Sequence, residues 1–244
     1  MHSVPTANES KCWPSPVPNR KKIARTNQAG PRERPASFFA RTFPQKCKSE
    51  QQMRLPKISP WLVCLGLTGW AIAQPAQLIP RQEWGSQPLA VPDEMRQTPQ
   101  RVVLHHSGVL WKEGDDAFLK IRALQAWGQR EKNWPDLPYH FMIDPEGRIF
   151  EGRELHYRPE SNTSYDLKGV VNVELWGNFD EQPVTPQALA ATADLLAWLR
   201  AEHHLRELST HRLEAPGQTT CPGNYFMRYF ESGQLQKMID ERDD

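Results

Sequence analysis

The feature that most constrains this chain is a short apolar segment that follows Met53. Two basic residues come first, then an apolar run over residues 61–70, and then the small-x-small sequence Ala71-Ile72-Ala73. This order is typical of a secretory signal peptide, here with cleavage after Ala73. The run is too short for a transmembrane helix, which needs about 20 residues. We therefore expect residues 53–73 to be removed from an exported protein, periplasmic or secreted; the alternative is a buried core helix.

The 52 residues before Met53 do not fit a folded domain. They hold 10 Lys and Arg against 3 Asp and Glu, together with seven prolines and no sustained apolar periodicity. Such a segment cannot bury enough apolar surface to offset the conformational entropy lost on ordering. We expect Met53 to be the true start and residues 1–52 to be a disordered or untranslated upstream extension. The rival interpretation is a basic, disordered interaction arm.

The expected mature chain is residues 74–244, which is 171 residues and fits one domain with a sizeable core. It carries 18 Lys and Arg against 26 Asp and Glu, a net charge of −8, although the whole sequence has a net charge of +1. An acidic domain is poorly suited to a phosphate backbone, which argues against nucleic acid as a partner. We expect a monomer with no membrane span after cleavage.

Cysteine usage points to one thiol of interest. Cys12, Cys47 and Cys64 all lie before the expected cleavage site, and Cys221 lies in the sequence TTCPG. A lone cysteine in an oxidising compartment needs an explanation. The alternatives are an intermolecular disulfide, a nucleophile, a buried inert thiol and a metal ligand.

Hydrophobic patterning of residues 74–244 predicts strands interleaved with helices. Residues 74–100 are rich in Pro and Gln and are expected to be irregular. Thr185 and Pro186 have the residue types of a helix cap and a first helical position. The predicted strands cover residues 101–107, 139–143, 148–151 and 170–176, with a turn at 144–147; the predicted helices run from 115 or 116 to about 131, from 186, and after 224. This order predicts an α/β fold, a single domain with a mixed β-sheet flanked by helices.

Three segments carry side chains that bind metals. His105 and His106 end a predicted strand, where neighbouring side chains point to opposite faces, so one of the two can face a given site. His211 and Cys221 are ten positions apart across a loop with Pro and Gly, so they can converge. Two imidazoles and one thiolate suit zinc, and three ligands rather than four favour a catalytic site that also holds water. His106 and His140 are expected to be packing residues.

The combination of motifs supports a family resemblance. The sequences VVLHHSG, WPDLPYHFMIDPEGRIFEGR, VELWGNF and HRLEAPGQTTCPG follow one another in this order. Together they resemble the zinc-dependent N-acetylmuramoyl-L-alanine amidases, which group with the phage-lysozyme-type amidases and the peptidoglycan recognition proteins. The segment IPRQEWG, residues 79–85, is similar to the opening motif of the recognition-protein branch. The resemblance extends over roughly residues 79–235.

The resemblance implies roles for five residues. His105, His211 and Cys221 match the positions of the zinc ligands, and zinc is the implied cofactor. Tyr139 matches a tyrosine placed near the zinc-bound water and the substrate carbonyl. Thr219, two residues before the cysteine, matches a position that holds Lys or Thr in active members, and we expect it to position substrate or water.

The implied reaction is hydrolysis of the amide bond between N-acetylmuramic acid and L-alanine, so the expected partners are peptidoglycan or muropeptide fragments. Two alternatives from other classes stay open. The first is a peptidoglycan-binding module without catalysis, although binding-only members of the family usually lack the cysteine. The second is a zinc peptidase that acts on the stem peptide.

Overall fold

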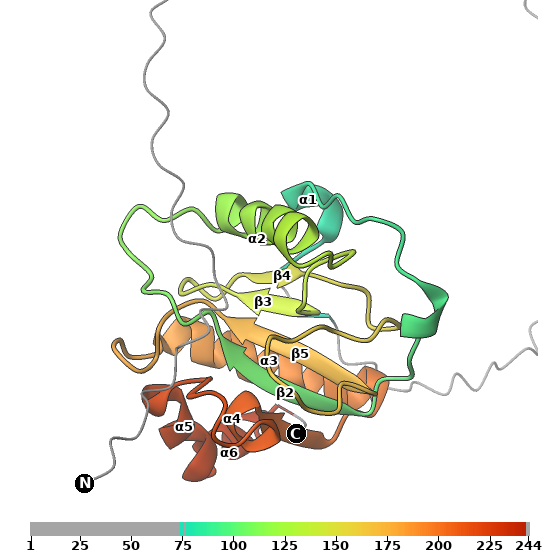
Figure 1. The fold of residues 1–244 in the computed structure, drawn as a ribbon. Helices are drawn as coiled ribbons and strands as arrows, with labels where there is room; N and C mark the ends of the chain where they lie inside the picture. Colours follow the sequence, from blue (N-terminus) through green and yellow to red (C-terminus); the bar gives the residue numbers. More distant parts are fainter. Residues whose placement is uncertain (1–73, 76, 243–244) are drawn as a thin grey trace, which may run out of the picture. The chain divides into compact units, whose positions relative to one another are not determined.

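The computed structural model shows a mixed β-sheet of six strands with helices on both faces (Figure 1). The structure describes residues 74, 75 and 77–242. The predicted signal peptide and the extension before it fall in residues 1–73, outside the described residues. The sheet and its flanking helices agree with the α/β fold class expected from the sequence.

The sheet has the strand order β1-β4-β3-β5-β2-β6. All neighbours pair in parallel except β3 and β4, which form the antiparallel hairpin expected from the sequence. The strands are β1 (Leu78–Ile79), β2 (Arg101–His106), β3 (Phe141–Ile143), β4 (Ile149–Glu151), β5 (Val170–Leu175) and β6 (Glu207–Thr210). The four predicted strands are present with slightly shorter bounds, and β1 and β6 were not predicted.

The helices include the three regions expected from the sequence. They are α1 (Arg81–Trp84), the 3-10 helix η1 (Asp93–Met95), α2 (Ala117–Glu131), α3 (Pro186–His203), α4 (His211–Glu214), α5 (Asn224–Glu231) and α6 (Gln234–Asp240). Asp116 caps α2 by accepting hydrogen bonds from two backbone N–H groups, those of Phe118 at 2.8 Å and Leu119 at 3.2 Å. Thr185 caps α3, where Pro186 is the first helical residue as predicted.

Successive side chains along each strand point to opposite faces of the sheet, so the interior has two hydrophobic cores, one on each face. Val102 and Leu104 of β2 pack with α3 on one face of the sheet, so His105 points to the opposite face. Helix α2 covers part of that opposite face (Figure 1). On β5, Asn172 and Glu174 point to the same face as His105. Polar side chains of two neighbouring strands thus gather on one side of the sheet.

The expectation that residues 74–100 are irregular was wrong in part, because β1, α1 and η1 lie there. These elements are only two to four residues long, and tertiary contacts hold them. Trp84 of α1 is fully buried and donates a hydrogen bond from Nε1 to the Glu151 carbonyl at 2.7 Å. Such short elements leave no periodic pattern in the sequence.

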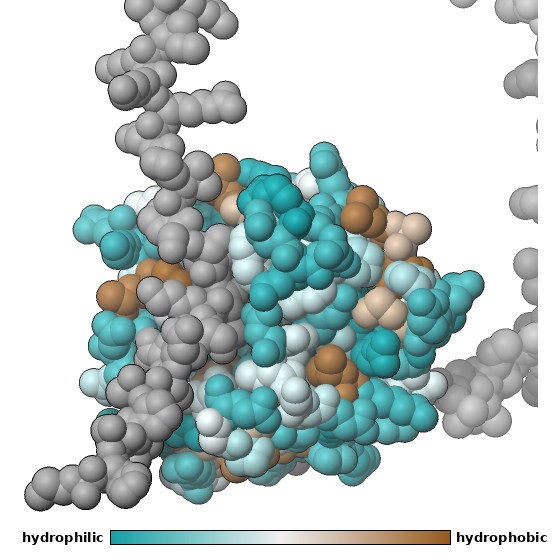
Figure 2. Space-filling model, viewed as in Figure 1, coloured by the Kyte–Doolittle hydropathy of each residue, from teal (hydrophilic) through white to brown (hydrophobic). Residues whose placement is uncertain are grey.

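The visible surface is mostly hydrophilic, with small separate hydrophobic patches (Figure 2). Exposed large hydrophobic side chains among the described residues are Leu89, Leu110, Leu119 and Leu213. In the described part of the chain, no helix is both long enough and apolar enough to cross a membrane.

The β3–β4 turn packs directly on the first turn of α3. Gly147 in this turn has a φ of +84°, and a Cβ at its position would lie 2.9 Å from the Gln187 carbonyl oxygen. Thr185 also donates a hydrogen bond to the Pro145 carbonyl at 2.6 Å. The hairpin and α3 therefore meet through backbone atoms that cannot move aside as a flexible side chain can.

We predict that Gly147→Ala destabilises the protein more than Gly114→Ala does. Gly114 has a similar φ of +82° but has nothing within 4 Å of its added Cβ, so it isolates the backbone cost of about 1–2 kcal/mol. The clash with α3 should cost Gly147→Ala about 1–3 kcal/mol more. Urea unfolding of both variants measures the difference. Equal losses of unfolding free energy would show that the turn moves away from α3 without cost.

Candidate metal centre

Parallel strand register brings the two candidate histidine ligands together. Leu104 of β2 pairs with Thr210, the last residue of β6. The next residues in the chain are His105, still in β2, and His211, the first residue of α4, and their ring centroids are 4.6 Å apart. Both imidazoles therefore lie at the carboxyl-terminal edge of the sheet, although they are far apart in sequence.

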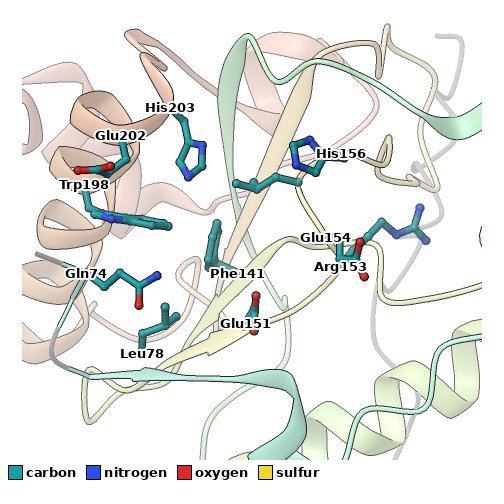
Figure 3. A pocket seen from close by; sticks show the side chains of 11 residues that line it. Gln74, Leu78, Phe141, Glu151, Arg153, Glu154, His156, Trp198, Glu202 and His203 are labelled. Carbon is teal, nitrogen blue, oxygen red and sulfur yellow. The ribbon is translucent and has the colours of Figure 1, made fainter. Parts of the chain in front are cut away.

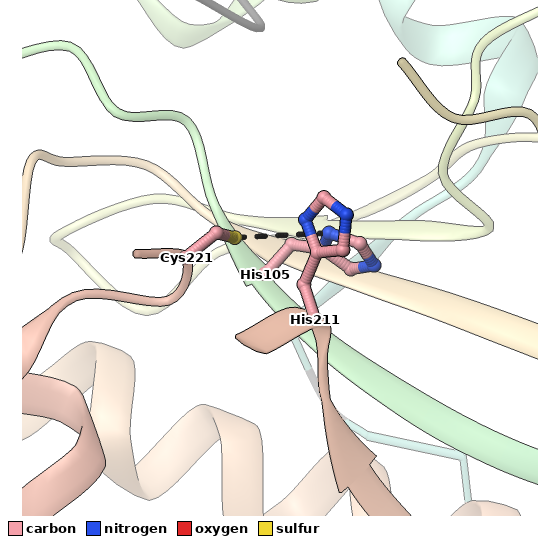
Figure 4. A group of neighbouring side chains, drawn as sticks. All are labelled: His105, His211 and Cys221. Atoms are coloured by element: carbon pink, nitrogen blue, oxygen red, sulfur yellow. Dashed lines mark hydrogen bonds between the residues drawn. The ribbon is translucent and has the colours of Figure 1, made fainter. Parts of the chain in front are cut away.

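Cys221 completes the group from the loop between α4 and α5 (Figure 4). The ligand atoms of His105, His211 and Cys221 lie within 4.8 Å of one another, and all three residues are buried. The Cys221 Sγ to His105 Nδ1 distance is 3.8 Å. A tetrahedral zinc ion separates its nitrogen and sulfur ligands by about 3.3–3.6 Å, so this spacing is close to that of a metal site.

The outer hydrogen bonds leave the inner nitrogens of both rings available. His105 Nε2 lies 3.0 Å from Asn172 Oδ1, and His211 Nε2 lies 2.6 Å from Thr163 Oγ1. The Nδ1 atom of His211 is buried and makes no hydrogen bond with the described residues. A buried nitrogen without a hydrogen-bond partner is costly unless another group binds it, and a metal ion would meet that need. The donor set of two imidazole nitrogens and one sulfur therefore fits zinc.

Burial also sets the ionisation state of these imidazoles. Desolvation lowers the pKa of His105 well below 6.5, and the neighbouring His211 lowers it further. Desolvation lowers the pKa of His211 to about 4. Both rings are therefore neutral at pH 7, which is the form that binds a metal, and no proton must leave them first.

The cysteine sulfur is oriented by the neighbouring backbone. The His106 N–H donates to Cys221 Sγ at 3.2 Å, and the Cys221 N–H donates to Thr219 Oγ1 at 3.1 Å. His106 itself faces the opposite side of the sheet and packs against Phe179, as expected for a packing residue. The Thr219 hydroxyl thus supports the cysteine loop, and it retains a proton to donate.

Arg212 links the two segments that carry His211 and Cys221. Its guanidinium donates from Nε to the Thr220 carbonyl at 3.1 Å and from Nη1 to Asn224 Oδ1 at 3.1 Å. Asp180 accepts hydrogen bonds from Thr220 Oγ1 at 2.8 Å and from the Asn224 N–H at 2.9 Å. Arg212, which follows His211, is therefore hydrogen-bonded to Thr220, which precedes Cys221.

Tyr139 lies beside the candidate metal centre. Its ring meets the His105 ring edge to face, with a centroid distance of 5.3 Å, and it is 5% exposed. Buried Arg153 fixes this segment by donating to the Leu137 carbonyl at 2.7 Å from Nε and to the Asp136 carbonyl at 3.0 Å from Nη2. The Arg153 N–H also donates to the Tyr139 carbonyl at 2.8 Å.

Three polar residues near the candidate ligands were not singled out from the sequence: Asn172, Glu174 and Thr163. Asn172 and Glu174 interrupt the apolar strand VVNVELW, and buried polar residues two positions apart in such a strand are a signal that could have found them. Thr163 lies in an irregular loop 48 positions from His211, and no local pattern marks it.

Glu174 is a fully buried carboxyl group in register with His105. Its Oε2 accepts a hydrogen bond from Trp176 Nε1 at 3.1 Å. Burial raises the pKa of Glu174 to about 8, although hydrogen bonds with Trp176 and Tyr139 partly offset the shift. A shift of this size at a site with a specific partner is typical of functional carboxylates.

A cavity of about 540 Å³ opens on the opposite face of the sheet (Figure 3). Phe141, Trp198 and His203 are among its lining residues, together with several carboxylates. The five sequence-predicted site residues do not line it. Convergence of metal-binding atoms, rather than cavity size, therefore identifies the candidate site.

Comparison with known proteins agrees with the observed fold. A family model described as N-acetylmuramoyl-L-alanine amidase matches residues 95–224, which is more than half of the chain. The chain therefore belongs to the N-acetylmuramoyl-L-alanine amidase family.

The relatives found by sequence are peptidoglycan recognition proteins, and an amidase structure shares the fold. Peptidoglycan-recognition protein SD of Drosophila simulans is 26% identical over 137 residues, which are 55% of this chain and 73% of that protein. The crystal structure of Drosophila PGRP-SD matches with a TM-score of 0.56 and 26% identity over 64% of this chain and 94% of that one. The Clostridium intestinale endolysin amidase LysCS shares the fold, with a TM-score of 0.53 and 21% identity over 67% of this chain and 98% of that one.

We predict that Glu174→Gln changes how stability depends on pH in protein kept metal-free by a chelator. The folded-state pKa of about 8 lies above the ordinary value of 4.5, so the folded wild type holds a proton that the unfolded chain has lost. The contribution of Glu174 to the unfolding free energy of the wild type therefore decreases as pH rises from about 4.5 to 8.

Glutamine cannot ionise, so the stability of Glu174→Gln relative to wild type should rise through this window and level off above it. The upper bound of the change is on the order of 3–5 kcal/mol. Urea unfolding at a series of pH values measures it, and other titrating groups cancel in the difference. A difference that stays constant with pH would contradict the assignment.

Proposed function

We propose that this protein hydrolyses the amide bond between N-acetylmuramic acid and L-alanine in peptidoglycan, with zinc held by His105, His211 and Cys221. The convergence of two imidazole nitrogens and one sulfur beside Tyr139 is the observation that carries the proposal. Membership of the amidase family supports the same reaction.

The chemistry needs a strong nucleophile and stabilisation of negative charge on the amide oxygen. Bound zinc supplies Lewis acidity, which lowers the pKa of a water molecule to about 7 and polarises a carbonyl group. The two neutral histidines and the cysteine would hold it. Three protein ligands are the number found in catalytic zinc sites, which keep a position for water or substrate.

Tyr139 and Glu174 have complementary roles in this proposal. The Tyr139 hydroxyl donates a hydrogen bond to the substrate carbonyl oxygen as negative charge develops there; an ordinary phenol, with a pKa of about 10, is a poor base. Glu174 lies on the same face of the sheet as His105 and is hydrogen-bonded with Tyr139. The positive charge of bound zinc would lower the pKa of this buried carboxyl group, and in its ionised form Glu174 would accept the proton of the attacking water and deliver it to the departing amine of L-alanine.

A binding module without catalysis is the main alternative, because relatives of this chain include recognition proteins. The presence of Cys221 favours a catalytic function over a binding-only one. A protein that only binds peptidoglycan has no need of a buried thiol beside two neutral imidazoles, and the binding-only members that the sequence resembles usually lack this cysteine.

We also propose that residues 74–244 are the exported product, released by cleavage after Ala73 into the periplasm or the exterior. Peptidoglycan and its muropeptide fragments are found in these compartments.

We predict that the purified protein, supplied with zinc, releases peptides with free L-alanine amino termini from cell wall, and that a chelator abolishes the release. Mass spectrometry of the products identifies the bond that is cut. Cys221→Ser is the matched variant: it should stay folded, lose most bound zinc and release no peptide.

Two outcomes would contradict the proposal. Intact substrate with full zinc occupancy would favour a binding module, and cleavage within the stem peptide would identify a zinc peptidase.

We predict that Tyr139→Phe retains zinc but lowers kcat by about 10²–10³-fold, because the lost hydroxyl is a donor to the developing oxyanion. The ring and its contact with His105 remain in this variant. Steady-state kinetics and metal content of the same preparation measure both effects. Undiminished kcat would remove Tyr139 from the mechanism.

A further inference from the structure

Asn172 is a fully buried amide in the middle of β5, between the candidate metal ligands and the segment that carries Tyr139. Its Oδ1 lies 3.0 Å from His105 Nε2, and its Nδ2 donates to the Pro138 carbonyl at 3.2 Å. Pro138 directly precedes Tyr139. One side chain therefore contacts both parts of the site.

The chemistry of these contacts fixes the orientation of the amide. A backbone carbonyl can only accept a hydrogen bond, so the NH₂ group of Asn172 must face Pro138. The Oδ1 atom must then face His105. The Tyr165 hydroxyl, which donates to the same oxygen at 3.4 Å, agrees with this orientation.

The orientation of the amide in turn fixes the tautomer of His105. Because Asn172 Oδ1 is an acceptor, the neutral His105 ring must carry its proton on Nε2. The lone pair of Nδ1 then faces Cys221 Sγ, 3.8 Å away. Thr163 gives His211 no such constraint, because a hydroxyl can donate or accept.

The backbone of Asn172 adds a second connection to the same segment. Its N–H donates to His140 Nδ1 at 2.9 Å, and its carbonyl accepts from the His140 N–H at 2.9 Å. His140 directly follows Tyr139. Residues on both sides of Tyr139 are therefore tied to Asn172.

We propose that Asn172 is a positioning residue that holds His105 in the Nε2–H tautomer for metal binding and ties this ligand to the Tyr139 segment. The first part concerns the metal site alone; the second part rests on the proposed amidase function. A group in this outer position typically changes metal affinity by about 10–100-fold when removed.

Two substitutions in the full chain separate the two roles. Asn172→Leu has a similar size and removes both polar contacts, so its zinc dissociation constant should rise by about 10–100-fold. Asn172→Asp keeps an oxygen for His105 but loses the donor to Pro138. It should bind zinc within a few-fold of wild type and have a lower kcat, with little change in KM.

Gln97→Leu is the control for a general loss of stability. Gln97 also bonds to backbone carbonyls, including that of Val170 at 3.0 Å, but at the amino-terminal end of β5. It should lower the unfolding free energy without changing zinc affinity. Chelator competition measures zinc binding, and circular dichroism checks that each variant is folded.

Zinc affinity in Asn172→Leu equal to that of Gln97→Leu would overturn the first role, and wild-type kcat in zinc-saturated Asn172→Asp would overturn the second. If Asn172→Leu does not fold, ¹⁵N NMR of the metal-free wild type decides the first role, because His105 should be wholly the Nε2–H tautomer. Finding the proton on Nδ1 would contradict it. These metal and tautomer measurements do not depend on whether the protein is an amidase.

Discussion

Parallel pairing between β2 and β6 is the constraint on which the candidate metal centre depends. The register that pairs Leu104 with Thr210 makes His105 and His211 the next residues at one edge of the sheet. A slip of one residue would turn His105 toward α3 and its apolar core. The packing of β2 between two parallel neighbours therefore secures the geometry of the two histidines before any metal binds.

The hydrogen-bond partners that orient the three candidate ligands are all uncharged. His105 meets an amide, His211 meets a hydroxyl and Cys221 accepts from a backbone N–H. A carboxylate in these positions would push more negative charge onto the imidazoles. Neutral partners fix the ring orientations with less charge transfer, so bound zinc would keep more of its Lewis acidity, which suits a site that must polarise an amide.

The sequence predicted the longer elements well because their signals are local. Apolar runs predicted β2 and β5, and Thr185 predicted the cap of α3. The sequence placed the start of α2 at residue 115 or 116, and Asp116 is the observed cap. By contrast, β1, β6 and α1 are short elements that exist through their partners. The candidate ligands could be named from residue types and spacing, but Asn172 and Thr163 act through contacts made only in the folded chain.

X-ray absorption at the zinc edge of the loaded protein tests the central claim most directly. The account predicts one sulfur at about 2.3 Å and two imidazole nitrogens at about 2.0–2.1 Å, with one further light atom from solvent. Cys221→Ser should lose the sulfur contribution. A wild-type spectrum with no sulfur neighbour, or with imidazole from a single histidine, would contradict the shared site.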